Sequence, residues 1–154
     1  MGKEIERKFI VNSDIYKQLS NGVFYKQGYL NSKMERTVRV RIYDNKSFIT
    51  VKGEATGAVR REYEYEIPVD DANEMLDFLC EKPVIEKTRY KYVYEGFTWE
   101  IDVFLGDNEG LVIAEIELED ENTHFKKPCW VGEEVTGDPK YFNSNLIKNP
   151  YKHW

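Results

Sequence analysis

The chain has 154 residues and carries 28 acidic against 22 basic side chains, a formal net charge of -6 at pH 7. The length suits one compact domain, so we expect a single domain over residues 1–154. The acidic balance gives no general attraction for nucleic acid or an anionic membrane, and neither is expected as a partner. With no secretory signal and no apolar stretch long enough to span a membrane, a cytoplasmic protein is expected.

Most of the chain alternates between apolar and polar residues with a period of two, which is typical of β-strands. The connections at 44–46, 95–96 and 106–108 are short and turn-like, so neighbouring strands should pair as antiparallel hairpins. A mainly β protein of the α+β class is therefore expected. The alternation predicts eight strands, at 3–11, 24–30, 35–43, 46–53, 60–67, 86–95, 97–105 and 111–119.

Helices are the minority. Apolar residues recur at helical spacing between 71 and 80 and predict a helix there, with Asp71 and Glu74 resembling a capping box at its start. A second helix is expected over 138–149, because Asp138 is a cap residue followed by a proline at the first helical position. We expect both helices, together with aromatic-rich loops, to cover the apolar face of the sheet from outside.

Charged side chains recur at every second position of the strands, so in each strand they share one face. The opposite faces are apolar, as in the run Trp99, Ile101 and Val103. Acidic residues and lysine are depleted in strands, and like charges two residues apart repel unless something neutralises them. The charged faces carry the acidic residues Glu4, Glu6, Glu62, Glu64, Glu66, Glu100, Asp102, Glu115, Glu117 and Glu119, and the basic residues Lys8, Arg39, Arg41, Lys52, Lys87, Arg89 and Lys91.

Three explanations of these charges are open. A half-solvated sheet with its charged face in water explains any single strand. Internal ion pairs could compensate the charges without a ligand, but apolar residues often replace such pairs at no cost in stability. A divalent metal together with a polyphosphate would neutralise both signs, because carboxylates bind hard cations while arginine and lysine bind phosphate oxygens. An eight-stranded barrel with the charges inside could hold one such ligand.

Short strings of residues follow one another along nearly the whole chain in an order that is specific as a set, although Glu-x-Glu-x-Lys alone would be a weak signal. The strings are Glu-x-Glu-x-Lys at 4–8, QGYL at 27–30, RVR at 39–41, VKG at 51–53, RREYEYEI at 60–67, EKTRY at 86–90, WEIDVF at 99–104, AEIELE at 114–119 and EVTGDPKY at 134–141. With these strings the chain resembles the CYTH or triphosphate tunnel metalloenzyme family, specifically its short bacterial single-domain members.

The resemblance implies a fold and an activity. The implied fold is an eight-stranded antiparallel closed β-barrel, a tunnel, with a few outer helices. The implied activity is metal-dependent hydrolysis of a linear triphosphate, with inorganic tripolyphosphate as the preferred substrate and Mg²⁺ or Mn²⁺ as the cofactor. Nucleoside or thiamine triphosphates, cyclisation of ATP by an adenylate cyclase, and a non-catalytic polyphosphate-binding module remain the alternatives.

The resemblance also implies roles for individual residues. The substrate-binding residues are expected to be Lys8, Tyr29, Arg39, Arg41, Lys52, Lys87 and Arg89. The principal metal ligands are expected to be Glu4, Glu6 and Glu117, while a second metal, a water or the basic residues could be held by Glu62, Glu64, Asp102 and Glu115. The catalytic set is expected to be Glu6, Lys8, Arg39, Arg41, Lys52, Lys87, Arg89, Asp102 and Glu115. A solvated surface position is expected for Lys3, Arg7 and Arg60.

Overall fold

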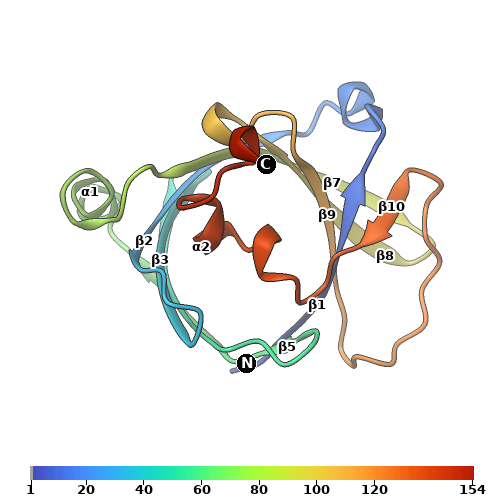
Figure 1. Cartoon of the computed structure of the whole chain (residues 1–154), viewed down its shortest axis with the longest axis horizontal. Coiled ribbons are helices and arrows are strands. Elements are labelled where there is room, and N and C mark those ends of the chain that lie inside the picture. The colour runs from blue at the N-terminus through green and yellow to red at the C-terminus, as the bar shows by residue number, and fades with distance from the viewer. Residues whose placement is uncertain (1) are drawn as a thin grey trace.

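A computed structural model describes residues 2–154 and contains one strongly curved antiparallel sheet. Figure 1 shows the strands curving around a central space. Each of the eight strands expected from the sequence is present, with its ends within two residues of the predicted bounds. The strands are β1 (Glu4–Val11), β2 (Val23–Asn31), β3 (Arg36–Tyr43), β4 (Lys46–Gly53), β5 (Val59–Arg60), β6 (Glu62–Ile67), β7 (Ile85–Tyr94), β8 (Phe97–Phe104), β9 (Val112–Glu117) and β10 (Val131–Glu134).

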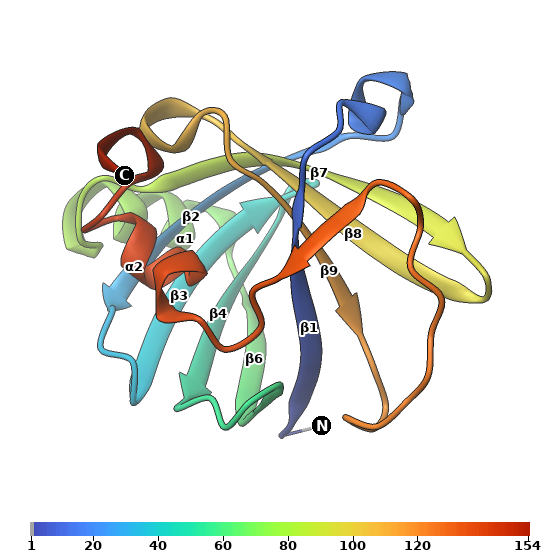
Figure 2. The same cartoon turned by 45° about the vertical axis from the view of Figure 1, so that its right-hand side comes forward.

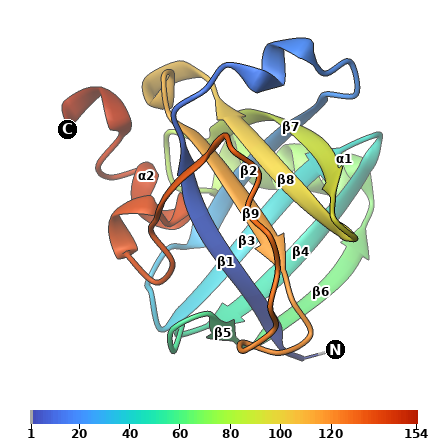
Figure 3. The ribbon, with the colours of Figure 1, turned by 90° about the vertical axis from the view of Figure 1, so that its right-hand side faces the viewer.

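The sheet has ten strands: nine follow the order β10-β1-β9-β8-β7-β2-β3-β4-β6, and β5 pairs with β1 outside this order. The sheet is not closed, so the predicted eight-stranded closed barrel is wrong in strand number and in closure. The cause lies at β1, whose edge away from β9 is divided. Its first residues pair with the two-residue strand β5 (Figure 3), and its last residues pair with β10 (Figure 2). β6 begins after Arg61 and pairs with β4, so its other edge forms no ladder within residues 2–154.

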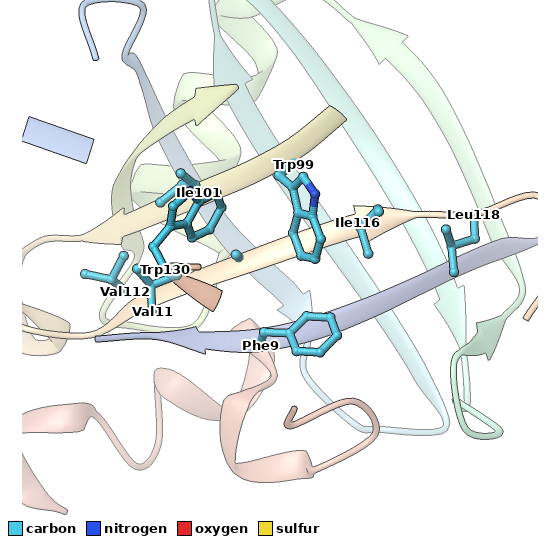
Figure 4. Close-up of a cluster of buried hydrophobic side chains, with 9 residues drawn as sticks. Phe9, Val11, Trp99, Ile101, Val112, Ile116, Leu118 and Trp130 are labelled. Carbon is cyan, nitrogen blue, oxygen red and sulfur yellow. The ribbon is translucent and has the colours of Figure 1, made fainter. Parts of the chain in front are cut away.

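The outer face of β1, β8 and β9 carries the largest apolar cluster, which Figure 4 shows as side chains on neighbouring strands. The chain between β9 and β10 folds over this face. Phe125 and Trp130 from that segment pack against Trp99, with ring centroids at 5.7 and 5.9 Å. The expectation that an aromatic-rich loop covers the apolar face is confirmed.

The predicted helix at 71–80 is present outside the sheet (Figure 1). It starts two residues early as α1 (Val69–Glu74) and continues as the π-helical turn η2 (Met75–Leu79). Its N-cap is Pro68 and no side chain caps it, so the predicted capping box is wrong. Its apolar stripe, with Leu76 1% exposed, packs against the outer side of β2, β3 and β4.

The predicted continuous helix over 138–149 is wrong. Asp138 does cap a helical turn, because its side chain accepts a hydrogen bond from the backbone of Lys140 at 3.1 Å. The backbone of Phe142 is then extended and interrupts the helix, so only short pieces form. The remaining helical elements are η1 (Ile15–Gln18), η3 (Gly106–Asn108), η4 (Pro139–Tyr141), α2 (Asn143–Leu146) and η5 (Tyr151–His153).

The C-terminal segment lies inside the curve of the sheet and does not cover its outer face (Figure 1). Leu146 and Ile147 are buried against Ile85, Phe104 and Ile113. These three strand residues lie two positions from Lys87, Asp102 and Glu115, so the inward face changes from charged to apolar along each strand. The C-terminal segment therefore closes the apolar end of the interior. Across residues 2–154, no helix has the length and apolar character needed to cross a membrane.

Two leucines of the outer helix give a matched test of this packing. Leu76→Ala should lower the free energy of unfolding by about 2–5 kcal/mol, because it leaves a cavity between helix and sheet. Leu79→Ala, at a side chain that is 66% exposed, should change it by less than about 0.5 kcal/mol. Urea unfolding followed by circular dichroism measures both. Equal losses would contradict the burial described for this helix.

Candidate active site

A cavity of about 420 Å³ occupies the charged part of the interior. Strand alternation alone explains its lining, since every second side chain of a curved sheet points inward. Asp102 is the one predicted site residue outside the lining; it is 1% exposed and lies behind the cavity wall. The predicted site residues that line the cavity are Glu4, Glu6, Lys8, Tyr29, Arg39, Arg41, Lys52, Glu62, Glu64, Lys87, Arg89, Glu115 and Glu117.

Asp102 is the centre of a fully buried ion-pair group. Its carboxylate oxygens accept from Lys87 Nζ at 2.7 Å and from Arg89 Nε at 2.7 Å, and Arg89 also reaches Glu115 at 3.0 Å. Burial opposes ionisation of Asp102, but the charges of Arg89 and Lys87 hold its pKa below the usual value. Burial, with the neighbouring charges of Arg89 and Arg41, lowers the pKa of Lys87 to about 7, although the charge of Asp102 raises it.

Further ion pairs join the remaining walls of the cavity. Most of them connect neighbouring strands, one joins β3 to β6 past β4, and Lys52 of β4 also reaches β1 across the open side of the sheet. Internal ion pairing therefore accounts for part of the charge. These pairs are Lys52–Glu4 at 3.0 Å, Lys52–Glu62 at 3.8 Å, Lys8–Glu115 at 3.5 Å, Arg39–Glu64 at 3.5 Å and Arg89–Glu100 at 3.4 Å.

Two acidic side chains are left uncompensated. Glu6 and Glu117 face each other in register on β1 and β9, and neither forms an ion pair with any residue of 2–154. Burial and the charges of Glu115 and Glu4 raise the pKa of Glu6 well above its usual value. Burial and the charges of Glu4 and Glu100 raise the pKa of Glu117, at the exposed rim of the cavity. This part of the cavity favours a cation.

Two arginines on another wall of the cavity have too few acceptor partners. Arg41 forms no ion pair with any described residue, and its Nε donates to the amide oxygen of Gln27 at 2.9 Å. Burial and the neighbouring charges of Arg39 and Arg89 lower the pKa of Arg41 to about 10. Arg39 Nε is buried and has no hydrogen-bond partner within the described chain. Buried donors are normally satisfied, so this wall favours an anion.

The carboxylates fit a hard divalent cation by chemistry but do not form a finished metal cage. Among residues 2–154, no three or more aspartate, glutamate, histidine or cysteine side chains are grouped closely enough to hold a metal ion. Glu4 is engaged by Lys52 Nζ at 3.0 and 3.2 Å. Mg²⁺ sites commonly use only one or two carboxylates, with waters and substrate phosphates completing the coordination. Glu6 and Glu117, unpaired and mutually close, meet that requirement.

The expectation of a surface position is wrong for Arg60 and confirmed for the other two residues. Arg7 lies outside the cavity and pairs with Glu134 at 2.6 Å, and Lys3 is exposed. Arg60 lines the cavity, with its guanidinium 5.5 Å from the ring of Phe142. The signal was available, because Arg60 lies two residues before Glu62 and so shares its alternation.

The sequence analysis also missed Gln27 and three residues of the C-terminal segment. Gln27 lines up with Tyr25 and Tyr29 on β2 and is fully buried, but its neutral side chain was not counted among the charges. Phe142, Asn143 and Ser144 line the cavity because the segment turns into the interior. No strand periodicity marks them, so only the tertiary structure could identify them.

Comparison with known proteins places this fold and cavity in a family. The model of the CYTH domain matches residues 2–149. A protein named inorganic triphosphatase from Acetivibrio thermocellus is 66% identical over 154 residues, covering 100% of this chain and 99% of the relative. Another inorganic triphosphatase, from Nitrosomonas europaea, is 40% identical over 147 residues and covers 93% of this chain and 95% of the relative.

A solved crystal structure of an inorganic triphosphatase is similar to this one, with a TM-score of 0.64 and 35% identity, covering 94% of this chain and 93% of that chain. The sequence strings, the inward-facing charges and the family model agree over almost the full length. The chain belongs to the CYTH domain family.

Proposed function

We propose that the protein is a single-domain, metal-dependent triphosphatase that hydrolyses inorganic tripolyphosphate to orthophosphate and a shortened chain. The observation that carries the proposal is the presence of uncompensated charge of both signs in one cavity, at Glu6 and Glu117 and at Arg41, together with the unpartnered Nε donor of Arg39. A metal bound with a polyanion neutralises both groups. The two relatives named inorganic triphosphatase support the same substrate class.

The basic residues would bind and orient the triphosphate. Phosphoryl transfer needs positioning of the phosphate and neutralisation of its charge more than it needs a nucleophilic side chain. Water would form the new P–O bond while the bond to the leaving phosphate breaks, with the leaving group in line. The residues proposed to contact phosphate oxygens are Lys8, Arg39, Arg41, Lys52, Lys87 and Arg89, with Tyr29 nearby.

The acidic residues divide into two roles. We propose Glu6 and Glu117, with Glu4 when Lys52 moves to substrate, as the residues that would hold Mg²⁺ or Mn²⁺. A bound cation would supply charge neutralisation to the phosphate oxygens. The other acidic residues would orient basic side chains: Asp102 holds Lys87 and Arg89, and Glu64 holds Arg39. Glu62 and Glu115 likewise pair with Lys52 and with Lys8 and Arg89.

The aromatic residues of the cavity favour an inorganic substrate over a nucleotide. Tyr25 and Tyr43 line the cavity and could in principle stack on a base. Tyr25 is already stacked on Tyr43 at 4.4 Å and lies under the guanidinium groups of Arg41 and Arg89. Tyr43 also stacks on Phe48 at 5.5 Å. Neither of these two rings is free to stack on a base, which favours a substrate recognised through its phosphates.

Phosphate release from tripolyphosphate, ATP and thiamine triphosphate tests the proposal, each measured with Mg²⁺, with Mn²⁺ and with EDTA. We expect tripolyphosphate to give the highest kcat/KM and EDTA to abolish turnover. A higher kcat/KM for ATP would contradict the substrate assignment. Undiminished turnover in EDTA would contradict the metal requirement, and binding of tripolyphosphate without turnover would identify a binding module.

Glu6→Gln separates the catalytic role of Glu6 from its effect on stability. Turnover should fall at least about 100-fold, because a proposed metal ligand is lost. The metal-free protein should melt higher than the wild type at pH 8, and the difference should shrink towards pH 5. A raised carboxyl pKa contributes stability that is present below the ordinary value and lost as pH rises through the raised value.

The Glu6→Gln variant cannot ionise at this position, so it avoids the loss of folding stability that ionised Glu6 causes at high pH. Each kcal/mol of stability corresponds to about 2–4 °C of melting temperature in a chain of this size. Scanning calorimetry at both pH values measures the effect. A variant with full activity, or a melting difference independent of pH, would contradict the role given to Glu6.

Arg60→Ala tests the cation that lines the cavity beside Phe142. The side chain also donates to the carbonyl of Gly53 at 2.6 Å, which aims the guanidinium. Loss of a charged hydrogen-bond donor to substrate should raise KM for tripolyphosphate about 10-fold or more, with a smaller change in kcat. The matched control is Arg61→Ala, at the exposed neighbouring arginine, which should stay within about 2-fold of the wild type. Equal KM values for the two variants would remove Arg60 from the substrate site.

A further inference from the structure

We propose that the carboxamides of Gln27 and Asn143 are positioning residues, which orient Arg41 and Lys87 towards the substrate without neutralising them. The inference rests on the proposed function and extends it to the C-terminal segment. Neither residue carries a charge, and they lie 116 positions apart in the sequence. The structure joins them at the boundary between the charged cavity and the apolar end of the interior.

Gln27 connects Arg41 to Asn143. It is fully buried on β2, with 0% of its surface exposed. Its Oε1 accepts from Arg41 Nε at 2.9 Å, and its Nε2 donates to Asn143 Oδ1 at 3.1 Å. Arg41 has no other side-chain hydrogen bond among the described residues, so Gln27 provides the hydrogen bond that orients its guanidinium over the ring of Tyr25.

Asn143 connects the C-terminal segment to two strands. It is the first residue of α2, and its Oδ1 accepts both from Gln27 and from Lys87 Nζ, the latter at 3.2 Å. An amide oxygen has two lone pairs, so this atom is fully used. The docking of α2 thereby gives the Lys87 ammonium group on β7 a second acceptor beside Asp102, which it contacts at 2.7 Å.

The orientation of both amides is determined by chemistry. Arginine only donates hydrogen bonds, so the amide oxygen of Gln27 must face Arg41. The nitrogen of Gln27 then necessarily points to the oxygen of Asn143. Exchange of nitrogen and oxygen in either amide would set donor against donor, which leaves one arrangement for the whole relay.

A neutral acceptor differs from a carboxylate in its effect on substrate binding. Arg89 is held by Asp102 and Glu115, which cancel much of its charge. Gln27 orients Arg41 through a dipole, so the full positive charge remains available for a phosphate group. The relay therefore combines a fixed direction with an uncompensated charge, which is what recognition of a polyanion requires.

Five variants test the proposal, with kcat, KM and melting temperature measured for each, and with calorimetric binding of tripolyphosphate in EDTA as a readout independent of turnover. Gln27→Glu keeps the acceptor but adds a negative charge. Asn143→Ala removes the shared oxygen, Gln27→Met removes the amide of Gln27, and the variant that carries both Gln27→Met and Asn143→Ala completes a double-mutant cycle. Asn145→Ala is the control, because Asn145 lies on the same helix and, among the described residues, its side chain donates only to the carbonyl of Pro139 at 2.8 Å.

Gln27→Glu and Asn143→Ala should each weaken tripolyphosphate binding about 10- to 100-fold and raise KM more than they lower kcat, since each disturbs a charged hydrogen bond. Asn145→Ala should stay within about 2-fold of the wild type. The double variant should lose less than the product of the single losses, because both act on one relay.

Unchanged binding in Gln27→Glu and Asn143→Ala would overturn the proposal. So would equal losses in Asn143→Ala and Asn145→Ala, which would indicate docking of the segment alone. If the wild type binds tripolyphosphate in EDTA but does not hydrolyse it, the proposed function fails while the binding data still decide on the relay. Absence of both binding and hydrolysis would refute both.

Discussion

The structure depends on one constraint: charges of both signs are enclosed by a sheet whose outer face must be apolar. Removing charged groups from water costs free energy unless each finds a partner. Curvature brings opposite charges from distant strands together, as for Lys52 of β4 and Glu4 of β1. The same alternation places Trp99, Ile116 and Phe9 outside, where the loop to β10 buries them.

Opposite charges are fully paired in one part of the interior and only partly paired in another. The unpaired charges determine which ligands the site can bind. Asp102 anchors Lys87 and Arg89 without contacting the cavity itself. Glu6 and Arg41, in contrast, lack partners of opposite charge among residues 2–154. A purely structural network would pair them, since an unpaired buried charge destabilises the fold. Their imbalance is a cost in stability that a metal and a polyanion together would offset.

The alternation of apolar and polar residues along the sequence predicts the strands well, but it does not predict how the sheet closes. Alternation within each strand predicts the strand bounds within two residues and assigns Glu4, Lys8, Arg39 and Lys87 to one face, because side-chain direction is a local property. Closure depends on how β1 divides its free edge between β5 and β10, which involves pairs distant in sequence. Phe142 and Asn143 enter the cavity because Leu146 and Ile147 bury at its apolar end. No local period encodes that contact.

The central claim is that one cavity holds uncompensated acidic and basic groups that a metal and a polyphosphate satisfy together. Thermal melting of the metal-free protein with Mn²⁺, with tripolyphosphate, and with both tests it most directly, because a ligand that binds only the folded state raises the melting temperature. The metal neutralises acidic side chains that repel tripolyphosphate, and tripolyphosphate neutralises basic side chains that repel the metal. The rise in melting temperature with both ligands should therefore exceed the sum of the two separate rises. Purely additive shifts, or no shift with either ligand, would contradict the account.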